Sequence, residues 1–321
     1  MPDPMQTTGP DTAPAGMCRI PGGEFLMGSD RHYAEEAPAH RVRLRGFWMD
    51  ATTVTNAQFA RFVAATGYVT VAERPLDPAM YPGAKARDLK PGGLVFRMTA
   101  GPVPTDDYRQ WWAWTPGACW RHPEGRGTGI QSRPDHPVVQ VAYEDAAAYA
   151  AWAGRALPTE AEWEFAARGG LDGADFVWGD ELAPGGVHLA NTWQGGFPWQ
   201  NTAEDGFTGA APVASYPPNG YGLHDMAGNV WQWTTDWFAA RHAADPQKSC
   251  CTPADPRGPA MEASFDPDQP AIAIPRRVVK GGSFLCAPSY CRRYRPAARH
   301  AQMVDSGMSH LGFRCILRDP A

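Results

Sequence analysis

Helical periodicity is confined to two short regions of this chain. In the first, Thr55 and Gln58 form a capping box, apolar residues follow at helical spacing, and Gly67 supplies a stop. In the second, an alanine-rich stretch over 144–153 is followed by a new capping box, Thr159 with Glu162, which opens another helix. The apolar positions follow core periodicity, so we interpret these helices as scaffold.

The rest of the chain indicates turns and short strands. The 321 residues include 34 Gly, 32 Pro and 13 Trp, a composition that favours many turns around large aromatic side chains. Short apolar runs predict strands over 41–44, 138–141, 278–279 and 313–317. Neither a shift in composition nor an internal repeat divides the chain. We therefore predict one compact, irregular α+β domain over 17–321, low in regular secondary structure.

The first sixteen residues differ from the rest. Residues 1–16 are rich in Pro, Thr, Ala and Gly and lack a basic start and an apolar stretch, which predicts a disordered tail rather than a signal peptide. No later run approaches the roughly 18 apolar residues of a membrane span. A net charge of −5, with scattered basic residues, excludes nucleic acid as the main partner. We expect a soluble, cytoplasmic protein.

Two of the seven cysteines, Cys286 and Cys291, lie five positions apart. Two nearby thiolates can form a disulfide or hold a soft metal ion, and the spacing alone leaves a structural disulfide or two unrelated thiols open. An odd number of cysteines leaves at least one thiol unpaired within a monomer. In a reducing cytoplasm, a retained pair is more often catalytic or metal-binding. The adjacent Cys250 and Cys251 lie in a Pro-rich stretch, and we assign them no role.

Other chemistries find little support. The sequence contains no phosphate-binding loop, no Gly-x-Ser-x-Gly elbow, no His pair at helical metal-ligand spacing and no Cys-x-x-Cys. Two stretches rich in Asn, Asp and Gly, 191–192 with 204–207 and 225–232, offer the oxygen ligands that Ca²⁺ prefers. They lack the spacing of an EF-hand, and the same residue types also serve ordinary turns.

Several motifs, in serial order, resemble one family. They are Pro21–Ser29, Val54–Phe59, Leu157–Gly170, Asn219–Leu223, Gly228–Trp231 and Leu311–Arg314. From about Cys18 to Arg318 the chain resembles a formylglycine-generating enzyme of the sulfatase-modifying-factor family, bacterial type. The resemblance implies a C-type-lectin-like fold. Because many relatives keep the fold but lack the cysteine pair, Cys286 and Cys291 favour the catalytic enzyme over its non-catalytic relatives.

The resemblance also implies a reaction and its site. Molecular oxygen, with a thiol reductant, would convert the cysteine of a Cys-x-Pro-x-Arg motif in an unfolded sulfatase polypeptide to formylglycine. Cys286 and Cys291 would hold Cu(I), a soft ion suited to two thiolates. Ser283 and Trp231 would belong to the same site. We expect a monomer, which would leave the substrate groove accessible.

Charged neighbours of the pair leave alternatives open. Arg292, Arg293 and Arg295 would favour the thiolate forms if their charges point inward, or they would only pack or contact peptide. His310 stands where the family commonly has Asn, and either alters peptide preference or packs.

Two calcium sites are implied by the resemblance. The first consists of Asn191, Thr192, Asp205 and Phe207, and the second of Asp225, Gly228, Val230 and Gln232. At the second, Gln232 stands where the family usually has Glu and Asp225 replaces Asn, so we expect weaker binding or another ion there.

Two other function classes share this fold. A non-heme iron sulfoxide synthase needs an added N-terminal helical domain with a histidine-rich iron site, and no such domain fits before Cys18. A non-catalytic peptide- or carbohydrate-binding module would have no reason to keep Cys286 and Cys291 together.

Overall fold

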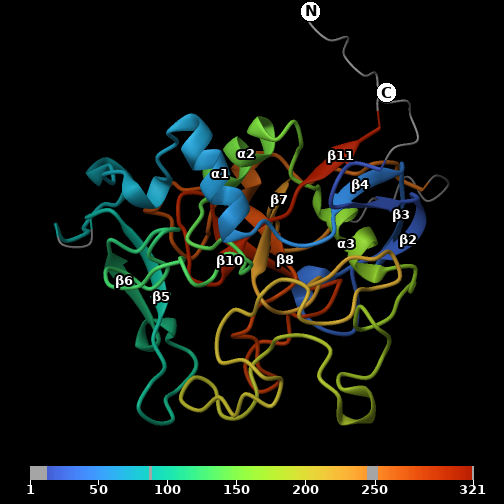
Figure 1. Cartoon of the computed structure of the whole chain (residues 1–321). Helices are drawn as coiled ribbons and strands as arrows, with labels where there is room; N and C mark the ends of the chain where they lie inside the picture. Colours follow the sequence, from blue (N-terminus) through green and yellow to red (C-terminus); the bar gives the residue numbers. More distant parts are fainter. Residues whose placement is uncertain (1–12, 87–88, 244–251, 320–321) are drawn as a thin grey trace, which may run out of the picture.

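The computed structural model describes residues 13–86, 89–243 and 252–319, drawn in Figure 1. Its α-helices are α1 (Asn56–Thr66), α2 (Tyr143–Trp152) and α3 (Glu160–Arg168). Its strands are β1 (Met17–Ile20), β2 (Gly23–Met27), β3 (His40–Leu44), β4 (Phe47–Asp50), β5 (Gly92–Phe96), β6 (Trp112–Pro116), β7 (Trp231–Trp237), β8 (Arg276–Lys280), β9 (Arg299–Met303), β10 (Leu311–Gly312) and β11 (Ile316–Arg318). Single 3₁₀ turns are η1 (Ala34–Glu36), η2 (Val71–Glu73), η3 (Pro78–Met80), η4 (Tyr108–Gln110), η5 (Pro184–Gly186) and η6 (Met261–Ser264).

The predicted helices are confirmed, and their local signals act as expected. The Thr55 hydroxyl accepts a hydrogen bond from the Gln58 backbone N–H, while the Gln58 side chain accepts one from the Thr55 N–H. Gly67 ends α1 with φ +66°, a left-handed conformation that suits glycine. Thr159 and Glu162 form the same reciprocal pair at the start of α3.

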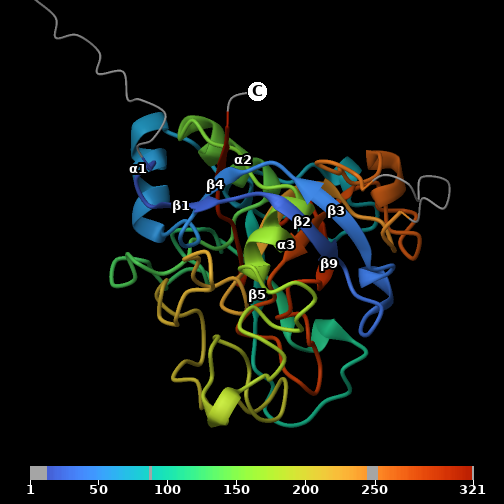
Figure 2. The same cartoon turned by 90° about the vertical axis from the view of Figure 1, so that its right-hand side faces the viewer.

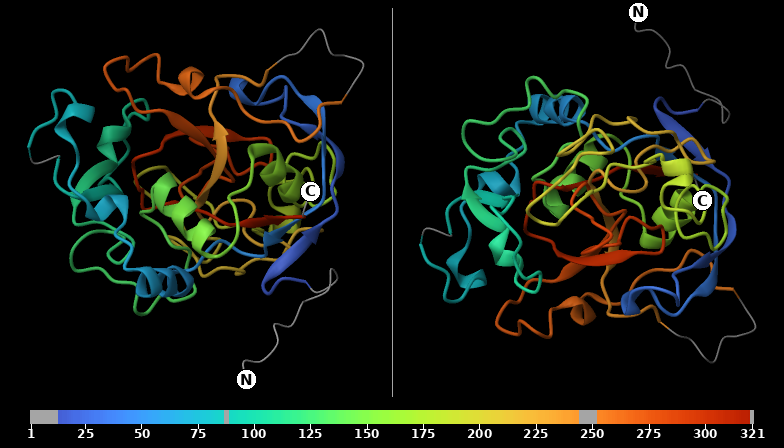
Figure 3. Two further views of the ribbon diagram at one scale, coloured as in Figure 1. Left: turned by 90° about the horizontal axis from the view of Figure 1, so that it is seen from above. Right: turned by 90° about the horizontal axis from the view of Figure 1, so that it is seen from below.

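The strands form small sheets around a central one. The central sheet has the order β10-β7-β8-β9, with β10 parallel to β7 and the other pairs antiparallel. A three-stranded sheet, β1-β4-β11, joins the two ends of the chain. Figure 3 shows the central sheet between the β5–β6 hairpin on one side and the strands β1 to β4 on the other. This arrangement confirms the predicted α+β domain with little regular secondary structure.

The predicted strands are only partly correct. Residues 41–44 and 278–279 lie in β3 and β8, as expected. The strand at 138–141 is wrong: the Val138 N–H donates to the Val54 carbonyl, but Gln140 has φ +59°, which breaks an extended ladder. Of 313–317, only the last two residues belong to a strand, β11.

Helix α3 packs against one face of the central sheet, and Figure 2 shows it between β2 and β9. Gln232, Lys280 and Arg299 are register partners on β7, β8 and β9, and all three side chains bond to α3. The Lys280 Nζ lies 3.0 Å from Glu164 Oε2, and Arg299 donates to Glu160 Oε2 at 2.7 Å. Gln232 accepts from the Trp163 indole. Because side chains alternate along a strand, the neighbouring residues point to the opposite face.

Strand β1 begins at Met17, while residues 1–12 of the predicted tail lie outside the described residues, as do Cys250 and Cys251. No helix in the described ranges is both long and apolar enough to cross a membrane.

Candidate active site

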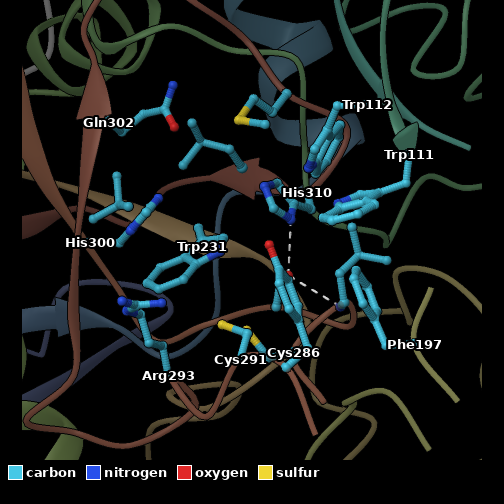
Figure 4. Close-up of a pocket in the computed structure, with 16 residues that line it drawn as sticks. Trp111, Trp112, Phe197, Trp231, Cys286, Cys291, Arg293, His300, Gln302 and His310 are labelled. Atoms are coloured by element: carbon cyan, nitrogen blue, oxygen red, sulfur yellow. Dashed lines mark hydrogen bonds between the residues drawn. The ribbon is translucent and has the colours of Figure 1, made fainter. Parts of the chain in front are cut away.

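A cavity of about 200 Å³ lies on the sheet face opposite α3. The sheet supplies its floor through Trp231 of β7, Val279 of β8, His300 and Gln302 of β9, and Leu311 of β10. Loop residues complete the wall: Trp111, Trp112, Phe197, Ser283, Leu285, Cys286, Tyr290, Cys291, Arg293, Met308 and His310 (Figure 4). All four residues predicted for the catalytic site, Cys286, Cys291, Ser283 and Trp231, therefore line one cavity, and the first two are the predicted copper ligands.

A glycine turn brings the cysteine loop into this cavity. Gly281 and Gly282 follow β8 with φ +94° and +70°, a region that side-chain-bearing residues rarely adopt. A Cβ on Gly282 would lie 2.9 Å from the backbone oxygen of Arg293, so only glycine lets the two arms of the loop approach each other. The Cys286 N–H then donates to the Ser283 carbonyl, and the loop turns back toward Cys291.

The two thiols are in direct contact. The Sγ atoms of Cys286 and Cys291 lie 3.0 Å apart, a hydrogen-bonding contact rather than the roughly 2.05 Å of a disulfide bond. Cys286 is 2% exposed, whereas Cys291 is partly exposed. The loop therefore presents one buried sulfur and one accessible sulfur at the same point of the cavity wall.

The surroundings favour one thiolate in the pair. The hydrogen bond with Cys286, opposed by burial and assisted by the charge of Arg293, lowers the pKa of Cys291 to about 6. Burial raises the pKa of Cys286 well above its ordinary value, and the neighbouring Cys291 adds to this effect. At neutral pH the pair consists of a Cys291 thiolate and a Cys286 thiol that donates to it.

The three arginines after the pair have different roles. Arg293 lines the cavity, donates to Glu35 at 2.6 Å and stacks 4.1 Å from the Tyr33 ring. Arg295 is instead paired with the buried Glu36 and donates to the Arg292 carbonyl. Arg292 is exposed. Both open alternatives hold, because Arg293 acts on the thiolate and Arg295 supports the fold.

Ser283 and Trp231 each contact a histidine of the cavity. The Ser283 Oγ lies 3.0 Å from Nδ1 of His310 and accepts a hydrogen bond from the Leu285 N–H at 3.2 Å. The Trp231 ring lies 5.6 Å from the His300 ring. Both predicted residues thus belong to the cavity wall.

An aromatic wall faces the thiols, and it was missed in the sequence. Tyr290 stacks on Phe197 with a ring separation of 4.3 Å and an angle of 3°, and Trp111 meets both rings edge-on. Tyr290 lies within the cysteine motif, but Trp111 and Phe197 come from distant loops. The adjacent tryptophans at 111 and 112 were their only local signal, and adjacency does not indicate which cavity they line.

Hydrogen bonds join three of the four residues of the first predicted calcium group. The Asp205 carboxylate accepts from the backbone N–H groups of Thr192 and Phe207 at 2.8 and 3.0 Å. Asn191 is 1% exposed, and its Oδ1 has no hydrogen-bond partner among the described residues. A buried oxygen without a donor is costly, and a cation would satisfy it, so these residues fit a hard ion such as Ca²⁺.

The second predicted group fits a cation poorly. The Gln232 Oε1 already accepts from the Trp163 indole at 2.8 Å and from the Arg314 guanidinium at 2.7 Å. Its amide donates to the Asp225 carbonyl, which Arg314 also contacts. Because a buried guanidinium occupies this position, the expectation of a Ca²⁺ ion there finds no support in the side-chain contacts.

The thiols are also an unusual metal site. Among the described residues, no three His, Cys, Asp or Glu side chains lie close enough to hold a metal together. The cavity therefore offers a metal two sulfur ligands without a third such protein ligand. Soft thiolates at low coordination number suit Cu(I) better than Zn²⁺, which takes three or four protein ligands.

The fold and the site together define a class of protein: an irregular α+β domain in which a loop turned by two glycines presents a pair of thiols to an aromatic cavity. Residues 4–319 match the model of the sulfatase-modifying factor enzyme 1-like domain, and the chain belongs to this family. It is 57% identical over 298 residues to the formylglycine-generating enzyme of Mycobacterium tuberculosis, covering 92% of this chain and 96% of that protein. The solved structure of PvdO from Pseudomonas aeruginosa shares the fold, with a TM-score of 0.61, 21% identity and 94% of each chain covered.

Family membership alone does not fix the activity. The chain is also 38% identical over 304 residues, 93% of this chain and 84% of the relative, to a mouse protein named inactive C-alpha-formylglycine-generating enzyme 2. The choice between an active and an inactive protein must therefore rest on the residues of the cavity.

Proposed function

We propose that this protein converts the cysteine of a Cys-x-Pro-x-Arg motif in an unfolded sulfatase to formylglycine. The observation that carries the proposal is the pair of reduced thiols, 3.0 Å apart, at the wall of an aromatic cavity. High identity to a formylglycine-generating enzyme over nearly the whole chain supports the same substrate class.

The reaction needs an oxidant and a reductant. Overall, one O₂ oxidises the substrate CH₂SH to an aldehyde and two reductant thiols to a disulfide, releasing H₂S and one water. We propose Cu(I) as the cofactor, held by Cys286 and Cys291; when bound, it would supply a soft ion that accepts a further thiolate and reacts with oxygen.

The chain's own residues prepare the site for that ion. Cys291 has already released its proton to the solvent at neutral pH, because its pKa is lowered to about 6, and Arg293 stabilises the resulting charge. The stacked Tyr290 and Phe197 line the same cavity as the thiols and offer a bound peptide an apolar surface there. Cys291 is the partly exposed member of the pair, so it is the sulfur that a peptide thiol could reach.

The direct test uses the reduced protein with Cu(I), oxygen, a thiol reductant and a Cys-x-Pro-x-Arg peptide. We expect an aldehyde, detected by the mass change and by capture with a hydrazine. A peptide with Ser in place of Cys should give none. Peptide binding without aldehyde, with or without copper, would reject the oxidase and favour a peptide-binding module.

The proposal also includes a second metal site, a location and an oligomeric state. We propose Ca²⁺ at Asn191, Thr192, Asp205 and Phe207, supported by the unpartnered Asn191 oxygen. A cytoplasmic location and a monomeric state remain predictions.

A further inference from the structure

The Ser283 hydroxyl has a restricted choice of hydrogen-bond partners. Ser283 is fully buried, and its Oγ accepts the Leu285 N–H. Its second contact is Nδ1 of His310 at 3.0 Å, and no other acceptor for the hydroxyl proton is found among the described residues. The hydroxyl is therefore satisfied as a donor only if it donates to Nδ1.

This contact determines where the imidazole carries its proton. Burial, with a smaller contribution from His300, lowers the pKa of His310 to about 3, so the ring is neutral at physiological pH. A neutral ring whose Nδ1 accepts a hydrogen bond must carry its proton on Nε2. The Trp112 ring packs against the imidazole at 4.7 Å and limits its rotation.

The other side of the ring faces the cavity. In Figure 4 the ring nitrogen of His310 that is not bonded to Ser283 points into the open space, toward the side of His300 and Gln302. Nε2 has no hydrogen-bond partner among the described residues. The cavity wall thus carries a fixed imidazole N–H donor without a protein acceptor, and the buried indole N–H of Trp111 also has none there.

We infer that His310 is a positioning residue, whose Nε2–H, fixed by Ser283, donates to a main-chain carbonyl of the peptide bound in the cavity. The identity of that peptide rests on the proposed function, but the tautomer does not. A main-chain carbonyl is the most frequent acceptor that an extended peptide offers, and a neutral donor can bind it without the desolvation cost of a charge.

The tautomer is tested by NMR on the full chain labelled with ¹⁵N-histidine, reduced, with and without Cu(I). We expect His310 to show a protonated Nε2 and an unprotonated Nδ1, unchanged across about pH 6 to 8. Ser283→Ala should shift the Nδ1 resonance of His310, while that of His300, in the same cavity without a serine partner, should stay. A protonated Nδ1, or titration within this range, would overturn the inference.

The donor role is tested by two variants that keep opposite halves of the imidazole. His310→Asn can still accept from Ser283 but does not reach the Nε2 position, whereas His310→Gln can place an amide N–H there. We expect Asn to raise KM for the peptide about three- to tenfold, the loss of one neutral hydrogen bond, with a smaller change in kcat. Gln should raise KM less than Asn.

Equal KM values for the Asn and Gln variants would refute the donor role. The same comparison can be made with the Kd of the Ser-containing peptide, which binds but cannot react. If the wild-type protein makes no aldehyde, the oxidase proposal fails, while the NMR tautomer and these Kd values still decide the role of His310.

Discussion

The two faces of the central sheet use alternate residues of the same strands in opposite ways. On the α3 face, Lys280 and Arg299 are fully buried charges, each paired with a carboxylate of α3. On the cavity face, the next residues along, Val279 and His300, line an open space. His300 has no hydrogen-bond partner among the described residues.

The difference separates the residues that hold the fold from those that are available for chemistry. Gln232, Lys280 and Arg299, which β7, β8 and β9 send toward α3, all form buried hydrogen bonds with that helix, and these contacts make the face specific. The glycine turn after Lys280 then carries the chain from the α3 face to Ser283 and the thiols. The cysteine loop therefore starts directly after a residue that a buried ion pair holds to α3.

The largest effect should come from removing a thiol on the cavity face. Cys291→Ser, and likewise Cys286→Ser, should abolish copper-dependent aldehyde formation, since a hydroxyl is a poor ligand for Cu(I). The unfolding free energy of Cys291→Ser should change by less than about 1 kcal/mol, because Cys291 is partly exposed. The measurements are aldehyde yield and denaturant unfolding.

Cys18 provides the matched control, because it is a free cysteine outside the cavity whose thiol donates to the Gly222 carbonyl, as a serine could. Cys18→Ser should therefore keep its activity. Normal turnover by either cavity variant would remove the paired-thiol assignment.

Removing a buried carboxylate from the α3 face should lower stability rather than abolish the reaction. Glu164 accepts from Lys280, Arg168 and the Gly28 N–H, and all of these are buried. Glu164→Ala leaves buried charges unpaired, so we expect the unfolding free energy to fall by about 3–5 kcal/mol. The exposed pair of Glu24 with Arg43 is the control, and Glu24→Ala should cost less than about 1 kcal/mol.

The pH dependence of this face follows from the same pair. Burial alone would raise the pKa of Glu164, but Lys280 and Arg168 lower it to about 2. Its contribution to stability is therefore fully present above the unfolded pKa of about 4.3 and is lost as pH falls through about 2. A Glu164→Ala variant as stable as the wild type at neutral pH would contradict this account.

Local sequence signals were sufficient to predict the helices, but they could not predict contacts between residues far apart in the sequence. In the capping boxes at Thr55 and Thr159, both hydrogen-bonding partners lie within four residues of each other, so the local sequence is enough to predict them. The run 138–141 has a strand's composition, but a left-handed Gln140 and a single bond to Val54 decide its conformation. Such a contact with a residue more than 80 positions away has no local signal.

The same limit applies to the site. The resemblance identified Cys286 and Ser283, but the Ser283–His310 contact depends on β10 lying beside β7 in parallel, a topology that spacing does not reveal. Likewise, Arg293 and Arg295 look equivalent in the sequence. Glu36 neutralises Arg295 in the interior, which leaves Arg293 to act on the thiolate.

Ca²⁺ should stabilise the protein by an intermediate amount, and the site where it binds distinguishes the two predicted calcium groups. The Asn191 side-chain oxygen has no hydrogen-bond partner among the described residues, whereas the Gln232 oxygen accepts two hydrogen bonds. Ca²⁺ at about 100 times its Kd would add about 2.7 kcal/mol, so Tm should rise by several degrees relative to EGTA. Asp205→Asn should lose this increment. An increment that survives in Asp205→Asn but disappears in Asp225→Asn would place the ion at the second group instead.

The smallest effect concerns the charge beside the thiolate. In the reduced, metal-free protein, alkylation of Cys291 by iodoacetamide should rise with pH through about 6 and then level off, because the thiolate is the nucleophile. The alkylation rate of an ordinary thiol would instead rise through about pH 8.5.

Arg293→Gln should move the midpoint of this pH profile up by about one pH unit, since the larger cause, the hydrogen bond from Cys286, remains. Arg292→Gln, at the exposed neighbour, should leave it unchanged. Equal midpoints for the two variants would show that the sulfur contact alone sets the pKa, and that the cavity face owes nothing to Arg293.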